Sequence, residues 1–286
     1  MMPAFEELVQ QNKLGHLLGE LQAVARPALC LRAAAAKDLP VGCSRTGGLP
    51  DLPPGTPWPV RDGVLLEFLM QIHCEDLVEV DLEKSLPPAG LLSFFFDGML
   101  TGYNTGQGMD RCAVIFTPPG VELTPLQPPA DAPELFMVYD PPCRLGFERA
   151  LTLPPLCEVY DGDMIPMVTP LPFKSGDAAR YLKLVKALNP RGSWLLGHPV
   201  PIQGGELRLD LVVRHGAGRY KYKDYHWVHE KELTQKMSAL SLLFQAASDP
   251  ARGLNFGDAG RVYFWINRAD LEKGCFDNVR AILQSG

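Results

Sequence analysis

The chain has 286 residues, with 27 lysines and arginines against 33 aspartates and glutamates and a net charge of −6. This acidic balance argues against a surface that binds polyanions over its whole extent, so we do not expect nucleic acid to be the partner. A hydrophobic fraction of 46% supplies a substantial core and excludes global disorder. The 27 glycines and 27 prolines favour many short elements joined by turns over long helices.

The cysteines and the N-terminus predict a cellular compartment. Seven cysteines, an odd number without CxxC spacing, indicate neither a disulfide framework nor a cysteine zinc site. The first seven residues are acidic where a secretory signal is basic. No window approaches the roughly 18 consecutive apolar residues of a membrane span. We therefore expect a cytoplasmic protein without membrane association and with neither cofactor nor metal.

Two segments predict helices. Apolar residues recur at helical spacing over residues 5–24, with Gly15 and Gly19 as weak points. A second helix is predicted over residues 177–188, because an apolar face there is followed by the stop signal Asn189-Pro190.

Most of the remaining chain has the composition of β-strands. The predicted strands are aromatic or β-branched runs bounded by turn residues, and they lie at residues 90–96, 113–116, 207–213 and 261–266. Prolines crowd residues 117–172, and a proline cannot donate a hydrogen bond to a β-ladder. We therefore expect edge strands and extended loops in that stretch.

The chain contains two similar segments. Each has a Gly-x-Pro turn, an apolar run ending in glutamine, and a glycine that opens an aromatic strand, with phenylalanine four residues after that glycine. The key positions are Gly48, Gln71, Gly90 and Phe94 in the first segment and Gly197, Gln245, Gly260 and Phe264 in the second. This order predicts a duplication within a single domain. The expected repeats are 41–116 and 191–286, joined by a proline-rich connector over 117–190 and preceded by a helical extension over 1–40.

Seven motifs resemble those of the DUF1963 family, also called YwqG-like. They are GGLPDLPPGTPWP (47–59), FLMQIHCEDL (68–77), LPPAGLLSFFFD (86–97), GHPVPIQ (197–203), LLFQAASD (242–249), FGDAGRVYFWI (256–266) and DLEKGCFDNVRAILQ (270–284). The resemblance implies a mainly β (α+β) fold, a roll of antiparallel sheets in two related halves with a few peripheral helices. It implies no reaction, because the family has no established activity or catalytic residues. The chain departs from the family at Ala246-Ala247, where Ile-Asp is common, and so lacks a carboxylate there.

Gln71 and Gln245 are the first candidate site residues. Each lies within an apolar run, and a buried amide without partners costs about 1–3 kcal/mol. Either the backbone satisfies each amide, or two related glutamines line one ligand site between the halves, with Asp258 near its rim.

Asp249 and Asp258 are the candidate catalytic residues. Asp258 lies in a Gly-Asp-Ala-Gly segment, where an aspartate commonly bonds its own backbone in a turn. The alternative is a pair of carboxylates that perform acid/base chemistry in a cleft. Nothing in the sequence shows that the two approach each other.

Residues 214–236 form a basic segment interleaved with tyrosine and tryptophan, a composition that can bind phosphates and stack on bases. On an acidic chain we expect a solvated loop or a partner-facing arm instead. His226 and His229 within it match no zinc motif, so the segment does not predict a metal site.

These observations favour a non-catalytic module that binds a small polar ligand or a protein partner. One alternative is a hydrolase that acts on a polar metabolite or glycan through Asp249 and Asp258. Another is a toxin-neutralising protein that binds a basic partner with its acidic surface.

Overall fold

A computed structural model describes residues 2–98, 111–132, 141–160, 169–203, 207–215, 230–250 and 254–286. Its main feature is a ten-stranded antiparallel sheet, so the predicted mainly β class is confirmed. The strands are β1 (Arg26–Ala35), β2 (Arg45–Thr46), β6 (Glu67–His73), β7 (Leu91–Phe96), β8 (Cys112–Thr117), β10 (Cys143–Thr152), β11 (Trp194–Leu196), β12 (Leu240–Ala247), β13 (Arg261–Asn267) and β14 (Arg280–Gln284). Two small sheets pair β3 (Asp51–Leu52) with β9 (Thr124–Pro125) and β4 (Val60–Arg61) with β5 (Val64–Leu65).

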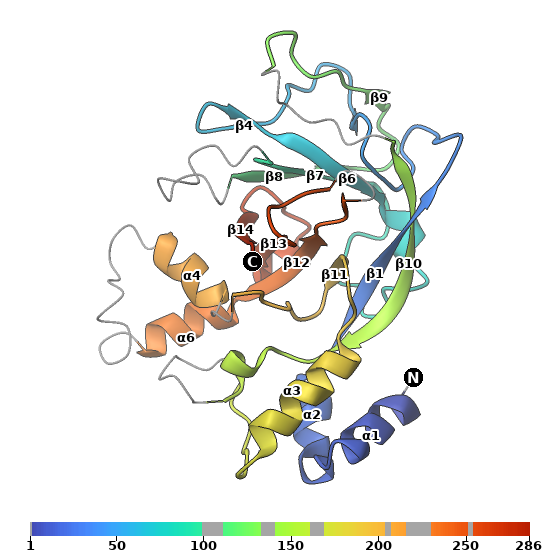
Figure 1. The fold of residues 1–286 in the computed structure, drawn as a ribbon. Coiled ribbons are helices and arrows are strands. Elements are labelled where there is room, and N and C mark those ends of the chain that lie inside the picture. The colour runs from blue at the N-terminus through green and yellow to red at the C-terminus, as the bar shows by residue number, and fades with distance from the viewer. Residues whose placement is uncertain are drawn as a thin grey trace.

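The sheet curls until its two ends face each other. The strand order is β14-β13-β12-β11-β1-β10-β2-β6-β7-β8, and Figure 1 shows β6–β8 above β12–β14 with β1 and β10 as the connecting wall. The main hydrophobic core fills the interior of this roll. Within it, the ring of Phe94 on β7 lies 5.1 Å from that of Phe244 and 5.6 Å from that of Phe264 on the opposite strands.

The long antiparallel pair β1–β10 divides the sheet into two blocks. We call β10, β2, β6, β7 and β8 the first block, and β1, β11, β12, β13 and β14 the second block. Strand order and direction, counted outward from this pair, are the same in both blocks. Both blocks carry a bulge at the corresponding place, between Phe68 and Met70 and between Leu242 and Phe244. The duplication itself stays a prediction, which this correspondence supports.

The predicted helical extension over residues 1–40 is wrong in its second part. The helices end at Val24, and β1 begins at Arg26 in the middle of the sheet. Its side chains alternate, since Ala28 and Cys30 join one core cluster and Leu29 joins the main core. Hydrogen bonding to β10 on one side and β11 on the other outweighs the helix preference of its alanines.

The predicted proline-rich connector also contains a central strand. We expected only edge strands and extended loops there, yet β10 lies between β1 and β2. The ten residues of β10 include no proline, so every one of them keeps the N–H that a central strand needs.

Residues 207–213 form a helix, not the predicted strand. This helix is α4 (Leu207–Arg214), which packs beside α6 (Glu230–Ser238). A short apolar run fits either element, and packing decides between them. Leu207 and Leu211 join the cluster of Trp194 and Trp265, while Leu209 packs with α6.

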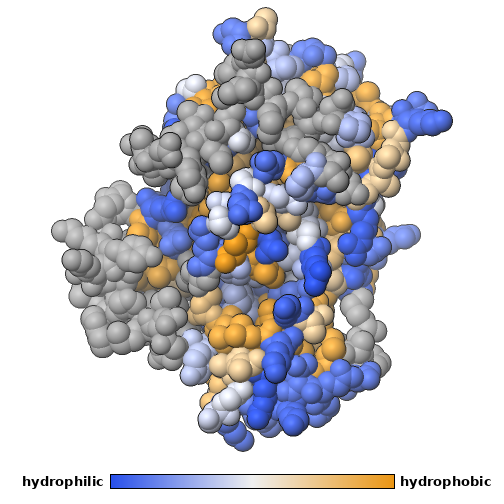
Figure 2. All heavy atoms as spheres, in the orientation of Figure 1, coloured by the Kyte–Doolittle hydropathy of each residue, from blue (hydrophilic) through white to orange (hydrophobic). Residues whose placement is uncertain are grey.

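The N-terminal helices and α3 form a separate layer at one end of the sheet. They are α1 (Met2–Gln11), the 3₁₀ turn η1 (Gly15–Leu17), α2 (Leu18–Val24) and α3 (Asp177–Leu188). The predicted helix over 5–24 is therefore interrupted, whereas the helix over 177–188 is confirmed. The apolar faces meet in a cluster that includes Phe5, Val9, Leu14, Leu21, Tyr181 and Leu184. Figure 2 shows hydrophilic residues over the outer side of this layer. Among all described residues, no helix is long and apolar enough to cross a bilayer.

The glycine before β13 is expected to resist substitution. A Cβ at Gly260 would lie 1.8 Å from the carbonyl oxygen of Phe256, so Gly260→Ala should lower the free energy of unfolding by about 1–3 kcal/mol. Gly19→Ala is the control, because nothing lies within 4 Å of its added Cβ and alanine favours the helix. Urea denaturation measures both. Equal stability of the two variants would contradict the close approach at Gly260.

Candidate functional site

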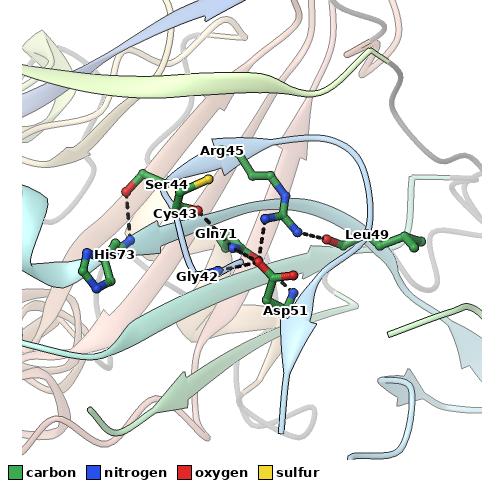
Figure 3. A network of polar contacts seen from close by, with 8 residues as sticks. All are labelled: Gly42, Cys43, Ser44, Arg45, Leu49, Asp51, Gln71 and His73. Carbon is green, nitrogen blue, oxygen red and sulfur yellow. Dashed lines mark hydrogen bonds and ion pairs between the residues drawn. The ribbon is translucent and has the colours of Figure 1, made fainter. Parts of the chain in front are cut away.

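The Gln71 side chain on β6 is fully hydrogen-bonded within the protein (Figure 3). Its Oε1 accepts from the backbone N–H of Asp51 at 2.9 Å. Its Nε2 donates to the carbonyl oxygen of Cys43 at 3.0 Å and to Oδ2 of Asp51 at 2.7 Å. Both amide hydrogens are used, so Gln71 ties the segment that precedes and includes β3 to the sheet.

Asp51 is the centre of this network. Its buried carboxylate also accepts from the Arg45 guanidinium at 2.5 Å and from the backbone N–H of Gly42 at 2.7 Å. Burial opposes ionisation, but hydrogen bonds from Arg45, Gly42 and Gln71 hold the pKa of Asp51 below its ordinary value. Arg45 donates in addition to the carbonyl of Leu49. The network thus fixes a loop.

Gln245 on β12 makes the corresponding bonds in the second block. Its Oε1 accepts from the backbone N–H of Val200 at 2.9 Å, and its Nε2 donates to the carbonyl of Gly192 at 3.3 Å. Each glutamine lies directly opposite a residue of the short strand beside it, Arg45 for Gln71 and Trp194 for Gln245. The two amides therefore anchor separate loops, one in each block, and these contacts are those of structural residues.

The two candidate carboxylates lie in different settings. Asp249 forms an isolated bridge with Leu254 and lines a cavity of about 290 Å³ together with Ser193 and Ser248. Asp258 lies on an exposed turn, where its carbonyl oxygen accepts from the N–H of Gly286.

Much of the basic segment 214–236, including His226 and His229, lies outside the described residues. Its ends belong to α4 and α6. Within the described ranges, no group of three or more histidine, cysteine, aspartate or glutamate side chains could hold a metal ion.

Replacing either glutamine should destabilise the fold. Gln71→Leu leaves buried partners of the amide unsatisfied, so we expect the free energy of unfolding to fall by about 1–3 kcal/mol, and Gln245→Leu to act in the same direction. Gln11→Leu on the exposed surface of α1 is the control, with a change within about 0.5 kcal/mol. Thermal and urea melts measure these effects. An unchanged melting temperature in both core variants would restore the ligand-site interpretation.

A larger cavity of about 850 Å³ lies where the two blocks meet α4. Residues 83–88, in the loop before β7, and Phe116 on β8 form part of its wall. The second block contributes the start of β1, the end of β11 with residues 197–198, the start of β12, and α7 (Arg268–Glu272). Strands distant in the sequence therefore build this cavity together.

The cavity wall is rich in charge and cationic in balance. Its cationic side chains are Arg26, Lys84, Arg208, Arg268 and Lys273, and its carboxylates are Glu83, Glu158 and Glu272. This excess of positive charge occurs on a chain whose net charge is −6. The wall therefore favours an anionic occupant.

Glu158 and Arg208 form a buried ion pair in this wall. Glu158 ends the 3₁₀ turn η4 (Leu156–Glu158) and is 2% exposed, while Arg208 lies on α4 and is 7% exposed. The Arg208 guanidinium also lies 5.2 Å from the ring centre of Trp265, a cation–π contact. Burial raises the pKa of Glu158, although the charge of Arg208 acts against this shift.

His198 is a buried, neutral imidazole in the same wall. It is 9% exposed, and its Nε2 lies 2.8 Å from the carbonyl oxygen of Val24. A carbonyl only accepts, so Nε2 carries the hydrogen and Nδ1 is left as an acceptor. Burial lowers the pKa of His198 to about 3; the bond to Val24 opposes this shift, and the charges of Arg208 and Arg26 reinforce it.

The turn before His198 holds the ring in this position. Gly197 has φ of 70°, and a Cβ there would lie 2.7 Å from Oγ1 of Thr152. The same Oγ1 accepts from the backbone N–H of His198 at 2.9 Å. The Gly-His-Pro turn is visible in the sequence, but it predicted no role for His198, and Glu158 and Arg208 were not among the predicted site residues. No spacing signal connects these three residues.

His198 should make stability depend on pH. Its folded pKa lies below the unfolded value near 6.5, so between these values the unfolded chain binds more protons and acid favours unfolding. The variant His198→Gln keeps a hydrogen-bond donor for Val24 but does not titrate. Between about pH 6.5 and 4.5 we expect its free energy of unfolding to fall less steeply than that of the parent, by about 1 kcal/mol per pH unit. Urea melts at several pH values test this. Parallel pH profiles for parent and variant would show that the ring is not held neutral.

Comparison with known proteins identifies the family. No curated protein matches the chain. The family described as a domain of unknown function (DUF1963) matches residues 44–285, which include nearly all of the sheet and the wall residues Glu158, His198 and Arg208. The match covers most of the chain, and the protein therefore belongs to the DUF1963 family.

Proposed function

We propose that this protein is a non-catalytic binding protein for a small anionic ligand, which occupies the 850 Å³ cavity between the two blocks and α4. The observation that carries the proposal is the buried Arg208 in a cavity wall where cationic side chains, the other four of them exposed, outnumber carboxylates. A cavity of this volume falls within the usual range of about 300–1,000 Å³ for small-molecule sites.

Arg208 is suited to recognise an anion. A guanidinium presents several N–H donors in a fixed plane that matches carboxylate and phosphate groups. Glu158 and Trp265 hold its position, so little side-chain entropy is lost when a ligand binds. Arg26, Lys84, Arg268 and Lys273 add positive charge around it, which attracts an anion from solution.

The other predicted functions have less support. A hydrolase that uses Asp249 and Asp258 needs both carboxylates at one cleft, and their settings differ. A toxin-neutralising role rests on the net charge alone. We place the anion-binding protein in the cytoplasm, since all seven cysteines are free thiols.

Titration with simple anions tests the proposal. We expect glycerol 3-phosphate to bind in calorimetric titrations and to raise the melting temperature. Arg268→Gln and Lys84→Gln each remove one wall cation and should weaken binding about five- to tenfold.

Lys183→Gln on the exposed face of α3 is the charge-matched control and should leave the affinity unchanged. Equal weakening by all three substitutions would mean that net charge, not the cavity, governs binding. A panel of phosphates and carboxylates that neither binds nor stabilises the parent protein would refute the proposed function.

A further inference from the structure

Two acceptor atoms on side chains that line the cavity have no hydrogen-bond partner among the residues that the structure describes. They are Nδ1 of His198 and Oε1 of Glu158, and both belong to side chains at least nine-tenths buried that line the cavity. The other polar atom of each side chain has a partner: His198 Nε2 bonds to the carbonyl of Val24, and the second Glu158 oxygen pairs with Arg208.

Unpartnered buried acceptors destabilise a fold unless something compensates them. Elsewhere in the same sheet the buried amides of Gln71 and Gln245 bond to backbone groups, while Oδ1 of Asp51 also lacks a partner among the described residues. The two acceptors on the cavity-lining side chains can therefore take a partner that the described residues do not supply. That partner must donate hydrogen bonds, because both atoms accept them.

We infer that the ligand carries a hydroxyl or amino group beside its anionic group, and that this group donates a hydrogen bond to Nδ1 of His198. Glu158 Oε1 is a second unpartnered acceptor on a side chain that lines the same cavity. The inference rests on the proposed function, because the anionic group binds at the cationic wall. It narrows the ligand class to hydroxylated or aminated anions such as sugar phosphates, hydroxy acids and amino acids.

The neutral state of His198 matters for this role. A protonated imidazole would present N–H groups on both sides and would repel a donor. The bond from Nε2–H to Val24 fixes the tautomer, so Nδ1 carries a lone pair and no hydrogen. Arg26 and Arg208, which act electrostatically on the ring, both favour the neutral form.

A matched pair of ligands isolates this hydrogen bond. Glycerol 3-phosphate and propyl phosphate share the anionic group and the three-carbon chain, and only the first carries hydroxyls. We expect the parent protein to bind glycerol 3-phosphate at least about tenfold more tightly, because propyl phosphate leaves the acceptors unpaired. Calorimetric titration measures both affinities.

Two substitutions then locate the acceptor. His198→Gln places an amide nitrogen near the position of Nε2 and keeps a donor for Val24, but removes the acceptor at Nδ1. It should abolish the preference for glycerol 3-phosphate while leaving the affinity for propyl phosphate within about twofold. His198→Asn keeps an acceptor near the position of Nδ1 and loses the reach to Val24, so it should lower the melting temperature yet retain the preference.

The outcomes separate the two claims. If neither phosphate binds the parent protein, the proposed function fails and this inference fails with it. If both bind with equal affinity, the anion site stands and the hydroxyl subsite is refuted. A preference that survives in His198→Gln would show that His198 Nδ1 is not the acceptor.

Discussion

The ladder between β1 and β10 is the constraint on which the rest of the structure depends. Ten residue pairs join these strands, and each strand also pairs outward, β1 with β11 and β10 with β2. In the sequence, β1 comes just before β2, β6, β7 and β8, but it pairs with β11 of the second block. Likewise, β10 comes before β11 to β14, but it pairs with β2 of the first block. Because buried backbone groups must be paired, neither block is complete without a strand from the other part of the chain. The roll, its core and the cavity between the blocks all follow from this exchange.

The two blocks use one scaffold for different purposes. In both blocks a glutamine side chain bonds to the backbone on either side of a short strand, β2 or β11. Its oxygen accepts a hydrogen bond from an N–H after that strand, and its nitrogen donates one to a carbonyl before it. The residue opposite the glutamine is Arg45 in the first block and Trp194 in the second. Arg45 pairs with buried Asp51, whereas Trp194 packs beneath α4. The apolar face of the second block thus packs against α4, the helix that carries Arg208. At the corresponding position the first block has a network of buried hydrogen bonds.

The cavity concentrates the polar groups that are hardest to explain by folding alone. A buried ion pair contributes little to stability, because the cost of desolvating both charges offsets their attraction. Glu158, Arg208 and His198 are nevertheless buried together at the junction of the blocks. This cost is one reason why we propose a role in ligand recognition for these residues. The positive wall on an acidic chain points to the same conclusion.

The sequence by itself determined the features that depend on local pattern. Aromatic strands 90–96 and 261–266, the helix over 177–188 and the family all follow from periodicity, turn residues and motifs. Residues 207–213 were predicted wrongly because a short apolar run fits a strand or a helix equally well, and packing against Trp194, Trp265 and α6 selects the helix. Tertiary structure alone brings Glu158, His198 and Arg208 to one wall, since they come from a 3₁₀ turn, a loop and a helix. Pairing between strands that are distant in the sequence leaves no local periodic signal. Neither the central position of β1 nor the cavity could therefore be predicted from the sequence.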